Sequence, residues 1–427
     1  MNPINSLLPE DTPGRPPVSR RIRAGWLIDG RGGPVMKDVL VEFSGKTIHA
    51  VRSDGPWAGI SEPVIDHTAG TLIPGLIDAH VHLFMSGIED VNLRKRFLSD
   101  PFETARERIL RHLRKHLSFG IIGVRDGGDH NGFAHRFKKE CRFGSRLPII
   151  LHVAGKAWHN VGRYGSLIGR SPGKNEDLAA GILRESSGID HVKILNSGIN
   201  SLILYGKETS PQFQIEELRK GVDTAASLGL PVMVHSNGKI PTEIAVSAGC
   251  SSIEHGFFMG TENLDRMRDQ DTIWVPTACT MKAFSGLYSG KSRDVSAKTL
   301  EHQVDQIRYA RKIGLKIAVG SDSGSMGVHH GASIMDELSI LLDAGYPIQN
   351  AIECAARNGA LLLGLSDFGI IAPGKSATVV AVTGPPDQLP WSLSRISGIY
   401  INGNPYNVDA QFREDSIQDE GFFFNSG

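Results

Sequence analysis

The sequence predicts an α/β protein in which a TIM (β/α)8 barrel is joined to a small β-sandwich domain built from both ends of the chain. Through the middle of the chain, stretches with helical periodicity alternate with short apolar runs, a pattern typical of a parallel sheet covered by helices. Eight such runs can be counted, and eight is the number of strands that closes a TIM barrel. They begin near Thr71, Ile121, Leu147, His191, Val232, Ser252, Thr272 and Lys316.

The two ends of the chain are richer in strand patterns than the middle. Runs such as Asp38–Phe43 and Ala377–Val382 are largely apolar, and Gly, Asp and Ser turns separate them from neighbouring runs. The predicted division of the chain is a flexible tail at 1–21, a β-sandwich domain at 22–72 and 369–412, the barrel at 73–368 and a second tail at 413–427.

One helix-and-strand unit shows how the barrel elements are identified. Ser210 and Pro211 suit the cap and the first position of a helix. Apolar residues follow at spacings of three and four as far as Ala225, and a strand ending at His235 comes next. The same unit recurs, with helical stripes over 102–117, 244–248 and 300–313.

Composition and charge argue against several classes of partner. The 427 residues carry 46 basic and 46 acidic side chains, so bulk charge gives no reason to expect nucleic acid or an anionic membrane. No apolar run approaches the length of a membrane span, and the proline-rich start lacks the apolar core of a signal peptide. The four cysteines are far apart, as expected of free thiols. We therefore expect a cytoplasmic protein.

The most informative motif is the pair His80 and His82 at the end of the first predicted barrel strand. Alternate residues of a strand point to the same side, so both imidazoles are presented together. Neutral imidazole is the commonest metal ligand. Alone, however, the pair is explained equally well by packing.

Three further residues favour a metal site, because barrel enzymes place their catalytic residues at the C-terminal ends of different strands. His235 and His255 end the fifth and sixth predicted strands, and Asp322 follows the eighth. Any one histidine among the 16 in the chain is better explained as a packed or surface residue. The set as a whole predicts metal binding.

Lys193 lies within the apolar fourth strand and leaves two interpretations open. Its ammonium can reach solvent along a flexible stem. Alternatively it points into the barrel mouth, where burial beside cations disfavours the charged form. A neutral amine there can add carbon dioxide and become a carbamate able to bridge two metals.

The ordered set of these residues, with the segment Gly369–Lys375 near the C-terminus, resembles the amidohydrolase superfamily. The likeness is to its binuclear branch, which contains Xaa-Pro dipeptidases, zinc-dependent arginine carboxypeptidases and ochratoxinase and is related to imidazolonepropionase. It implies two divalent metal ions, with zinc expected. It also implies the ligand set: His80, His82 and Asp322 on the more buried ion, His235 and His255 on the other, and carboxylated Lys193 bridging both.

Some segments depart from the common pattern of that superfamily. Ser197–Asn200 stands where relatives usually carry two glycines after the lysine strand, and the loop 155–164 differs from the usual Gly/His-rich stretch. Ser376–Thr378 also replaces the usual Ala-Asp. The first two lie where substrate would be recognised, so the resemblance does not carry specificity.

Other candidate residues surround this set. Asp322 is also the predicted general base. His159 is predicted to polarise a substrate carbonyl or to cap its loop, and Arg163 either binds a substrate carboxylate or is a solvated loop residue. His330 is a candidate for lining the pocket, with His329 beside it. Asp126 either orders the site or forms a local turn.

The hypothesis is therefore a metal-dependent amidohydrolase that cleaves a C–N bond of a small amide, such as a dipeptide or N-acyl amino acid, by metal-activated hydroxide. The alternatives are hydrolysis of a cyclic amide or of a lactone or other ester, and a catalytically silent binding protein. The resemblance also implies a homo-oligomer. We expect a small-molecule substrate, with no nucleic acid and no membrane as partners.

Overall fold

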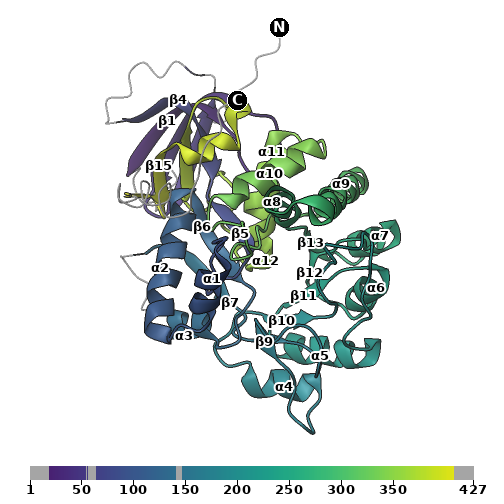
Figure 1. Ribbon diagram of the computed structural model, residues 1–427. Coiled ribbons are helices and arrows are strands. Elements are labelled where there is room, and N and C mark those ends of the chain that lie inside the picture. Colours follow the sequence, from purple (N-terminus) through teal and green to yellow (C-terminus); the bar gives the residue numbers. More distant parts are fainter. Residues whose placement is uncertain (1–18, 54, 56–63, 141–146, 408–427) are drawn as a thin grey trace.

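A computed structural model describes residues 19–53, 55, 64–140 and 147–407, and its elements are labelled in Figure 1. Strands from both ends of the chain form one seven-stranded sheet in the order β16-β15-β14-β4-β1-β2-β3. The bounds are β1 Arg20–Leu27, β2 Met36–Ser44, β3 Thr47–Ser53, β4 Val64–Pro74, β14 Val379–Thr383, β15 Ile396–Ile401 and β16 Asn404–Tyr406. The structure thus confirms that both ends build one sheet, while its packing as two layers of a sandwich stays a prediction.

The pairing within this sheet joins distant parts of the sequence. β4 runs parallel to β1 on one side and antiparallel to β14 on the other. Side chains of this sheet, among them Ile22, Phe43 and Val379, form a small hydrophobic core of their own. Because β1 begins at Arg20, the predicted tail at 1–21 is too long at its C-terminal end. Residues 1–18 and the second predicted tail lie outside the described residues.

The middle of the chain is α/β, as predicted, with parallel strands that follow one another in chain order except that β8 lies between β10 and β9. A three-stranded sheet has the order β5-β6-β7, and a six-stranded sheet has the order β13-β12-β11-β10-β8-β9. The bounds are β5 Leu76–Val81, β6 Ile121–Asp126, β7 Ile150–Val153, β8 Ala157–Trp158, β9 Gly169–Arg170, β10 Val192–Leu195, β11 Val232–Ser236, β12 Ser252–His255 and β13 Ile273–Val275.

The short strands β8 and β9 were not predicted, and two of the eight predicted runs differ in the structure. The run expected from Thr71 onward divides at Gly75, so that its first half ends β4 and its second half forms β5. The eighth strand, expected from Lys316, is an extended segment rather than a regular strand. Its backbone nevertheless bridges β13 and β5: Trp274 N donates to Lys316 O at 3.0 Å, and Ala79 N donates to Val319 O at 2.9 Å.

Helices follow most of these strands and surround them (Figure 1). Their bounds are α1 Val91–Leu98, α2 Phe102–Ser118, α3 Phe133–Glu140, α4 Leu178–Glu185, α5 Ile215–Ser227, α6 Lys239–Ser247, α7 Thr261–Asp269, α8 Cys279–Leu287, α9 Gly290–Ile313, α10 Ser333–Asp343, α11 Ile348–Glu353 and α12 Gly359–Leu362, with a π-helical turn at Cys354–Asn358 and 3-10 turns at Pro386–Gln388 and Trp391–Ser394. None of those within the described ranges combines the length and apolar character needed to cross a lipid bilayer.

The predicted start of α5 at Ser210 and Pro211 is wrong, because the helix begins at Ile215. The amides of Gln212 and Phe213 donate instead to the carbonyl and side-chain oxygens of Asn196, at 2.9 and 3.0 Å. These bonds hold the segment against the end of β10. Ser210 and Pro211 therefore belong to a loop and do not begin the helix.

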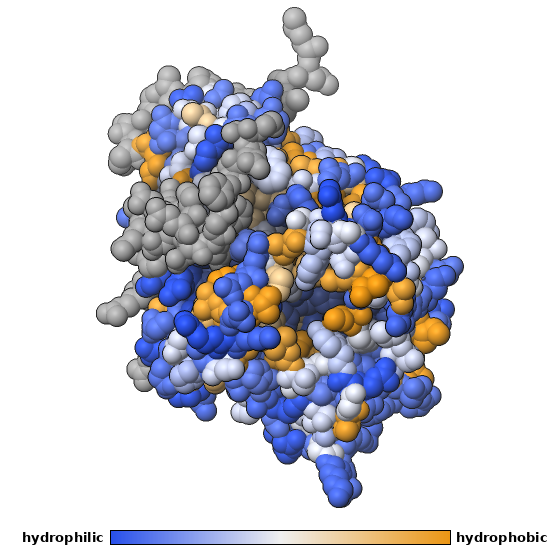
Figure 2. Space-filling model, in the orientation of Figure 1, coloured by the Kyte–Doolittle hydropathy of each residue, from blue (hydrophilic) through white to orange (hydrophobic). Residues whose placement is uncertain are grey.

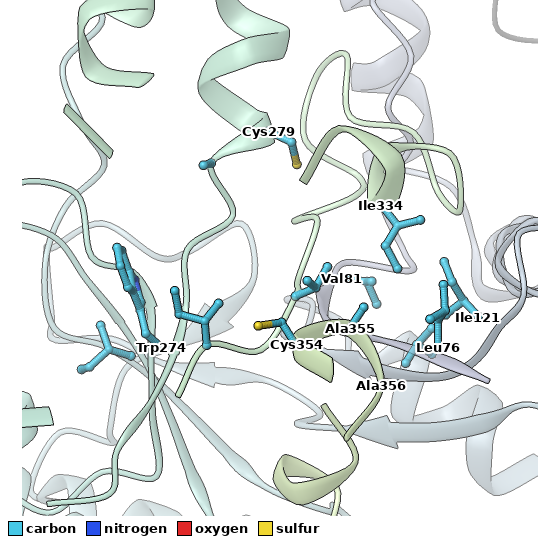
Figure 3. Packing of buried hydrophobic residues seen from close by; sticks show 14 of the residues in the cluster. Leu76, Val81, Ile121, Trp274, Cys279, Ile334, Cys354, Ala355 and Ala356 are labelled. Atoms are coloured by element: carbon cyan, nitrogen blue, oxygen red, sulfur yellow. The ribbon is translucent and has the colours of Figure 1, made fainter. Parts of the chain in front are cut away.

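The main hydrophobic core lies between the parallel strands and the helices around them. Figure 3 shows part of it, in which Leu76 and Val81 of β5 and Ile121 of β6 lie near Ala355. Three predicted free thiols, those of Cys250, Cys279 and Cys354, are buried and unpaired in disulfides, and the fourth, that of Cys141, lies outside the described residues. This packing fixes the strand ends on which the polar residues gather.

Candidate metal centre

His80 of β5 and His82, the first residue after that strand, are buried and held by their Nδ1 atoms. His80 Nδ1 lies 2.7 Å from Glu254 Oε2, and His82 Nδ1 lies 2.9 Å from the carbonyl oxygen of Gly128. Because both acceptors take a hydrogen bond from Nδ1–H, each ring presents Nε2 as the atom free to bind a metal. Both Nε2 atoms lie 3.5 Å from Oδ1 of Asp322.

Asp322 reaches this point from the extended segment beside β5. Its amide donates to the carbonyl of His80 at 2.8 Å, and Ser325 Oγ donates to its Oδ2 at 3.0 Å. Its backbone has a φ of +57° and that of His255 has +66°, a left-handed conformation uncommon outside glycine. Such strain, held in place by surrounding structure, is typical of functional sites.

The histidines that end β11 and β12 complete a cluster of four rings. The centroids of His235 and His255 are 4.6 Å apart, and those of His80 and His255 are 4.9 Å apart. Thr277 Oγ1 lies 2.7 Å from Nδ1 of His255, which again leaves Nε2 facing the cluster. His235 is bonded through the other nitrogen, since its Nε2 lies 3.1 Å from the carbonyl oxygen of Gly198.

Lys193 of β10 is almost completely buried, with 1% of its surface exposed. Within the described residues its Nζ has no hydrogen-bond partner, and neither does Nε2 of His80. Burying an amine that forms no hydrogen bond costs free energy, so Nζ is an atom that a bound ligand would satisfy. Burial lowers the pKa of Lys193 to about 8, which makes the neutral amine accessible.

Burial also sets the protonation of the other residues. It lowers the pKa of His82 to about 4 and that of His235 to about 3, and it holds those of His80 and His255 well below the ordinary value. The imidazoles are therefore neutral near pH 7, the form that binds metals. Burial raises the pKa of Asp322 to about 7.

The donor set fits a divalent metal. Ligand atoms of His80, His82 and Asp322 all lie within 4.8 Å of one another. The unbonded Nζ of Lys193 and Nε2 of His80 are the orphaned buried atoms that a cation and its ligands would satisfy. All six residues that the sequence predicts as ligands line one cavity.

Two buried charged residues behind the histidines were missed by the sequence analysis. Glu254, which holds His80, accepts through Oε1 from Arg125 Nη2 at 2.7 Å and from Ser252 Oγ at 2.5 Å. Arg125 also donates to the carbonyl of Ala79 at 2.8 Å. The sequence does contain a signal for both residues. Each is a charged residue inside a short apolar strand, and burying such a group requires a partner.

A cavity of about 330 Å³ opens beside the metal-ligand candidates. Figure 2 shows a hollow near the centre of one face of the molecule, bordered by hydrophobic residues. Besides the six ligand candidates, the lining consists of Met85, Arg94, Tyr164, Leu167, Ile168, Ile199, Asn200, Leu202, Asn237, Phe257, Thr280, Met281, Phe284, Tyr288, Ser325 and Met326. This wall is mainly apolar, as is usual for small-molecule sites.

The remaining predicted residues do not line this cavity. His159 is buried with Nδ1 2.9 Å from the carbonyl oxygen of Asn160, and exposed Arg163 donates to the carbonyl of Ser210 at 2.8 Å. His330 is buried and stacked on His112 with centroids 3.8 Å apart. His329, partly buried, is likewise absent from the lining.

Asp126, at the end of β6, satisfies both roles predicted for it. Its Oδ2 accepts from the amide of Leu83 at 2.8 Å, which orders the chain just after His82. Its Oδ1 accepts from the amide of Gly128 at 2.9 Å, the turn that also presents the carbonyl bonded to His82. The carboxylate therefore supports a ligand while closing a local turn.

The chain is similar to known proteins over most of its length. The model of the amidohydrolase family matches residues 71–411. Ochratoxinase of Aspergillus niger is 25% identical over 402 residues, covering 84% of this chain and 80% of its own length. Imidazolonepropionase of Porphyromonas gingivalis is 22% identical over 390 residues, covering 84% of each. A solved Xaa-Pro dipeptidase with bound methionine in the active site has a TM-score of 0.75 and 26% identity, covering 91% of this chain and 99% of that one.

Proposed function

The chain belongs to the amidohydrolase family and is a hydrolase of carbon–nitrogen bonds, and we propose that it cleaves the amide bond of a small substrate such as a dipeptide or an N-acyl amino acid. One observation carries the proposal: a buried lysine amine, which has no hydrogen-bond partner among the described residues, lies on a strand beside four neutral histidines and an aspartate. The Xaa-Pro dipeptidase relative, which holds an amino acid in its active site, supports this substrate class.

The metal ligands are those that the sequence predicts. His80, His82 and Asp322 would hold one divalent ion, and His235 and His255 a second, with zinc as the expected metal for imidazole and carboxylate ligands. Addition of carbon dioxide to the neutral amine of Lys193, with loss of one proton, would give a carbamate that could serve as a further ligand. When bound, divalent ions would supply Lewis acidity toward the scissile carbonyl and toward water.

The residues of the chain would then orient the reactants and move the proton. Asp322 takes a proton from the attacking water through a carboxylate oxygen and returns it to the departing amine nitrogen. Ser325 keeps that carboxylate in place. Glu254 and Thr277 fix the ring orientations of His80 and His255. The apolar wall of the cavity limits the access of bulk water to these groups.

We also propose how the chain is divided into domains. Residues 73–368 form a closed barrel, with the extended segment that carries Asp322 as its eighth member between β13 and β5. Residues 22–72 and 369–412, of which 54, 56–63 and 408–412 lie outside the described residues, would make up the β-sandwich domain. The resemblance in fold to the dipeptidase structure supports this plan, since that structure covers most of the chain.

The test combines metal content with activity. Zinc-reconstituted protein is screened against N-acyl amino acids and dipeptides, with cyclic amides and lactones in the same screen. Lys193→Ala is expected to lose at least about 100-fold in kcat/KM, because the ligand joining both metal positions is gone. Acetate or propionate, which can take the place of the carbamate, is expected to restore part of that loss.

The matched control is Lys316→Ala, which removes an exposed lysine paired with Asp271 at the start of the eighth segment. It is expected to keep full activity. Purified protein that contains no metal and remains active, together with an unimpaired Lys193→Ala variant, would contradict the proposed function.

A further inference from the structure

Arg94 is a cation on the wall of the cavity that neither the ligand set nor the proposed mechanism uses. It lies on α1, whose first turn is capped by Asp90 Oδ1 accepting from the amides of Asn92 and Leu93 at 2.8 and 3.0 Å. Nη1 of Arg94 donates to the carbonyl of Ser86, which fixes the guanidinium beside the segment that follows His82. The short helix therefore presents this side chain to the cavity.

The guanidinium keeps most of its hydrogen-bonding capacity. It has five N–H donors. The bond to Ser86 uses one, and Nη2 contacts Met85 Sδ at 3.9 Å, which is a weak acceptor. No carboxylate of the described residues forms an ion pair with it. Arg94 is thus held in place with donors to spare, the condition for a pre-organised anion site.

The charges around the cavity favour an anionic ligand. Among the described lining residues Asp322 is the one carboxylate, and it is committed to the metal in the proposed function. Asp322 and Tyr288 are the two groups that raise the pKa of Arg94 against the lowering effect of its burial, so both lie within its electrostatic reach. A ligand carboxylate at Arg94 would therefore sit near the metal ligands.

The surroundings of Arg94 are otherwise apolar. Tyr288 contacts Met326 Sδ through its hydroxyl at 3.8 Å, and the ring of Phe284 lies 5.8 Å from that of Tyr288, centroid to centroid. With Met85, these side chains form an apolar and aromatic surface next to the guanidinium. A flexible thioether and an aromatic ring accept unbranched and aromatic side chains of varied shape.

We propose that Arg94 binds the carboxylate of the substrate and that the amino acid carrying this carboxylate has an apolar side chain, which packs on Tyr288, Phe284 and Met326. This inference rests on the proposed function and deepens it. The substrate class becomes a dipeptide, or an N-acyl amino acid, whose C-terminal residue is apolar. Arg94 thus takes the carboxylate-binding role suggested by the sequence for Arg163. The guanidinium of Arg163 is exposed and bonded to a loop carbonyl.

The experiment measures the preference for a carboxylate over the uncharged amide. The probes are N-acetyl-L-leucine and N-acetyl-L-methionine with their carboxamides, and glycyl-L-leucine with glycyl-L-leucinamide. With zinc-loaded full-length enzyme, the acids are expected to have kcat/KM values about 10- to 100-fold above the amides, since a charge-assisted pair is lost in the amides. Arg94→Gln is expected to abolish this ratio mainly through KM, and Arg94→Lys to keep part of it.

The control is Arg96→Gln, which changes an exposed arginine on the same helix and is expected to leave the ratio unchanged. Binding of the same probes is measured in parallel by titration calorimetry, and thermal denaturation shows that each variant is folded. Carboxylates that bind in an Arg94-dependent manner without being hydrolysed would defeat the proposed function alone. An unaltered preference in Arg94→Gln, or no binding of any acid in the panel, would overturn the role of Arg94.

Discussion

At the scale of single residues, the metal centre depends on side chains that hydrogen-bond to the ligand candidates and hold them in place. Glu254 connects two strands, because one of its oxygens holds His80 and the other accepts from Arg125. All three side chains are at most 1% exposed. A buried charge pair of this kind contributes little net stability, but removing one partner leaves the other charge uncompensated.

Glu254→Gln should therefore reduce both metal binding and stability. We expect metal affinity to fall about 10- to 100-fold, because the tautomer of His80 is no longer fixed. The free energy of unfolding should fall by about 3 kcal/mol, because the guanidinium of Arg125 loses its ion pair. Elemental analysis after dialysis and urea denaturation measure the two effects.

Glu176→Gln is the control, since Glu176 pairs with Arg184 at the surface. It should bind metal normally and unfold at the same urea concentration as the wild type. Normal metal content in Glu254→Gln would show that this carboxylate does not orient His80.

The sequence located the ligand candidates but not the residues that support them. His80, His82 and Asp322 could be predicted because strand ends follow from local periodicity, and barrel strand ends converge. Glu254 could not, because its partner His80 lies 174 residues away. Arg94 could not, because Tyr288 and Asp322, which line the cavity with it, lie far from it along the chain. Pairings of that kind depend on three-dimensional packing, which a single sequence does not record.

At the scale of elements, the junction between the terminal sheet and the parallel strands passes through a single glycine. Gly75 separates β4 from β5, and its amide donates to the carbonyl of Thr378 at 3.3 Å. A Cβ at this position would lie 2.5 Å from Cγ1 of Ile122 and 3.0 Å from Cγ2 of Thr378. Both neighbours are β-branched and buried, so they have little freedom to move away.

Gly75→Ala should accordingly destabilise the protein by about 1–3 kcal/mol through overpacking. Chemical denaturation gives the magnitude. Gly286→Ala is the opposite case, because nothing lies within 4 Å of a Cβ at that helical position. It should stabilise the protein by about 0.5–1 kcal/mol through helix propensity. Equal stabilities for the two variants would mean that the junction tolerates a side chain.

Elements were predicted correctly where one strong pattern acts alone and incorrectly where local signals compete. The apolar stripe of α2 follows one regular pattern, and its predicted range agrees with the helix at Phe102–Ser118. At α5, hydrogen bonds to Asn196 keep the residues after Ser210 and Pro211 out of the helix, which begins at Ile215. The eighth segment has an apolar run but few ladder bonds, so its extended form depends on β5 and β13 at its sides.

At the scale of the whole molecule, buried histidines make stability depend on pH. His112 is 3% exposed, its Nδ1 donates to the carbonyl of Leu83 at 2.9 Å, and burial holds its pKa well below the ordinary value. The unfolded chain binds a proton at this histidine below about pH 6.5, whereas the folded chain does not. Stability from this residue is therefore lost as the pH falls through that value.

Between pH 7.5 and pH 5.5, the free energy of unfolding of the wild type should fall by about 1.4 kcal/mol more than that of His112→Asn, since asparagine can keep the bond to Leu83 without titrating. Urea denaturation in the presence of a chelator measures this difference without a contribution from metal release. Glu337, whose pKa burial raises to about 7, acts in the opposite direction in both proteins and cancels in the comparison. The same loss in both would show that His112 does not titrate on unfolding.

The position of β4 between β1 and β14 has a consequence for protein synthesis. As the ribosome extends the chain, β1 to β4 emerge first, and the partner for the free side of β4 is completed only at Thr383. For some 300 residues of translation, the nascent sheet therefore has an open edge, and open edges pair readily with other chains. The late strand β14 closes this edge, so its arrival protects the newly made protein from aggregation.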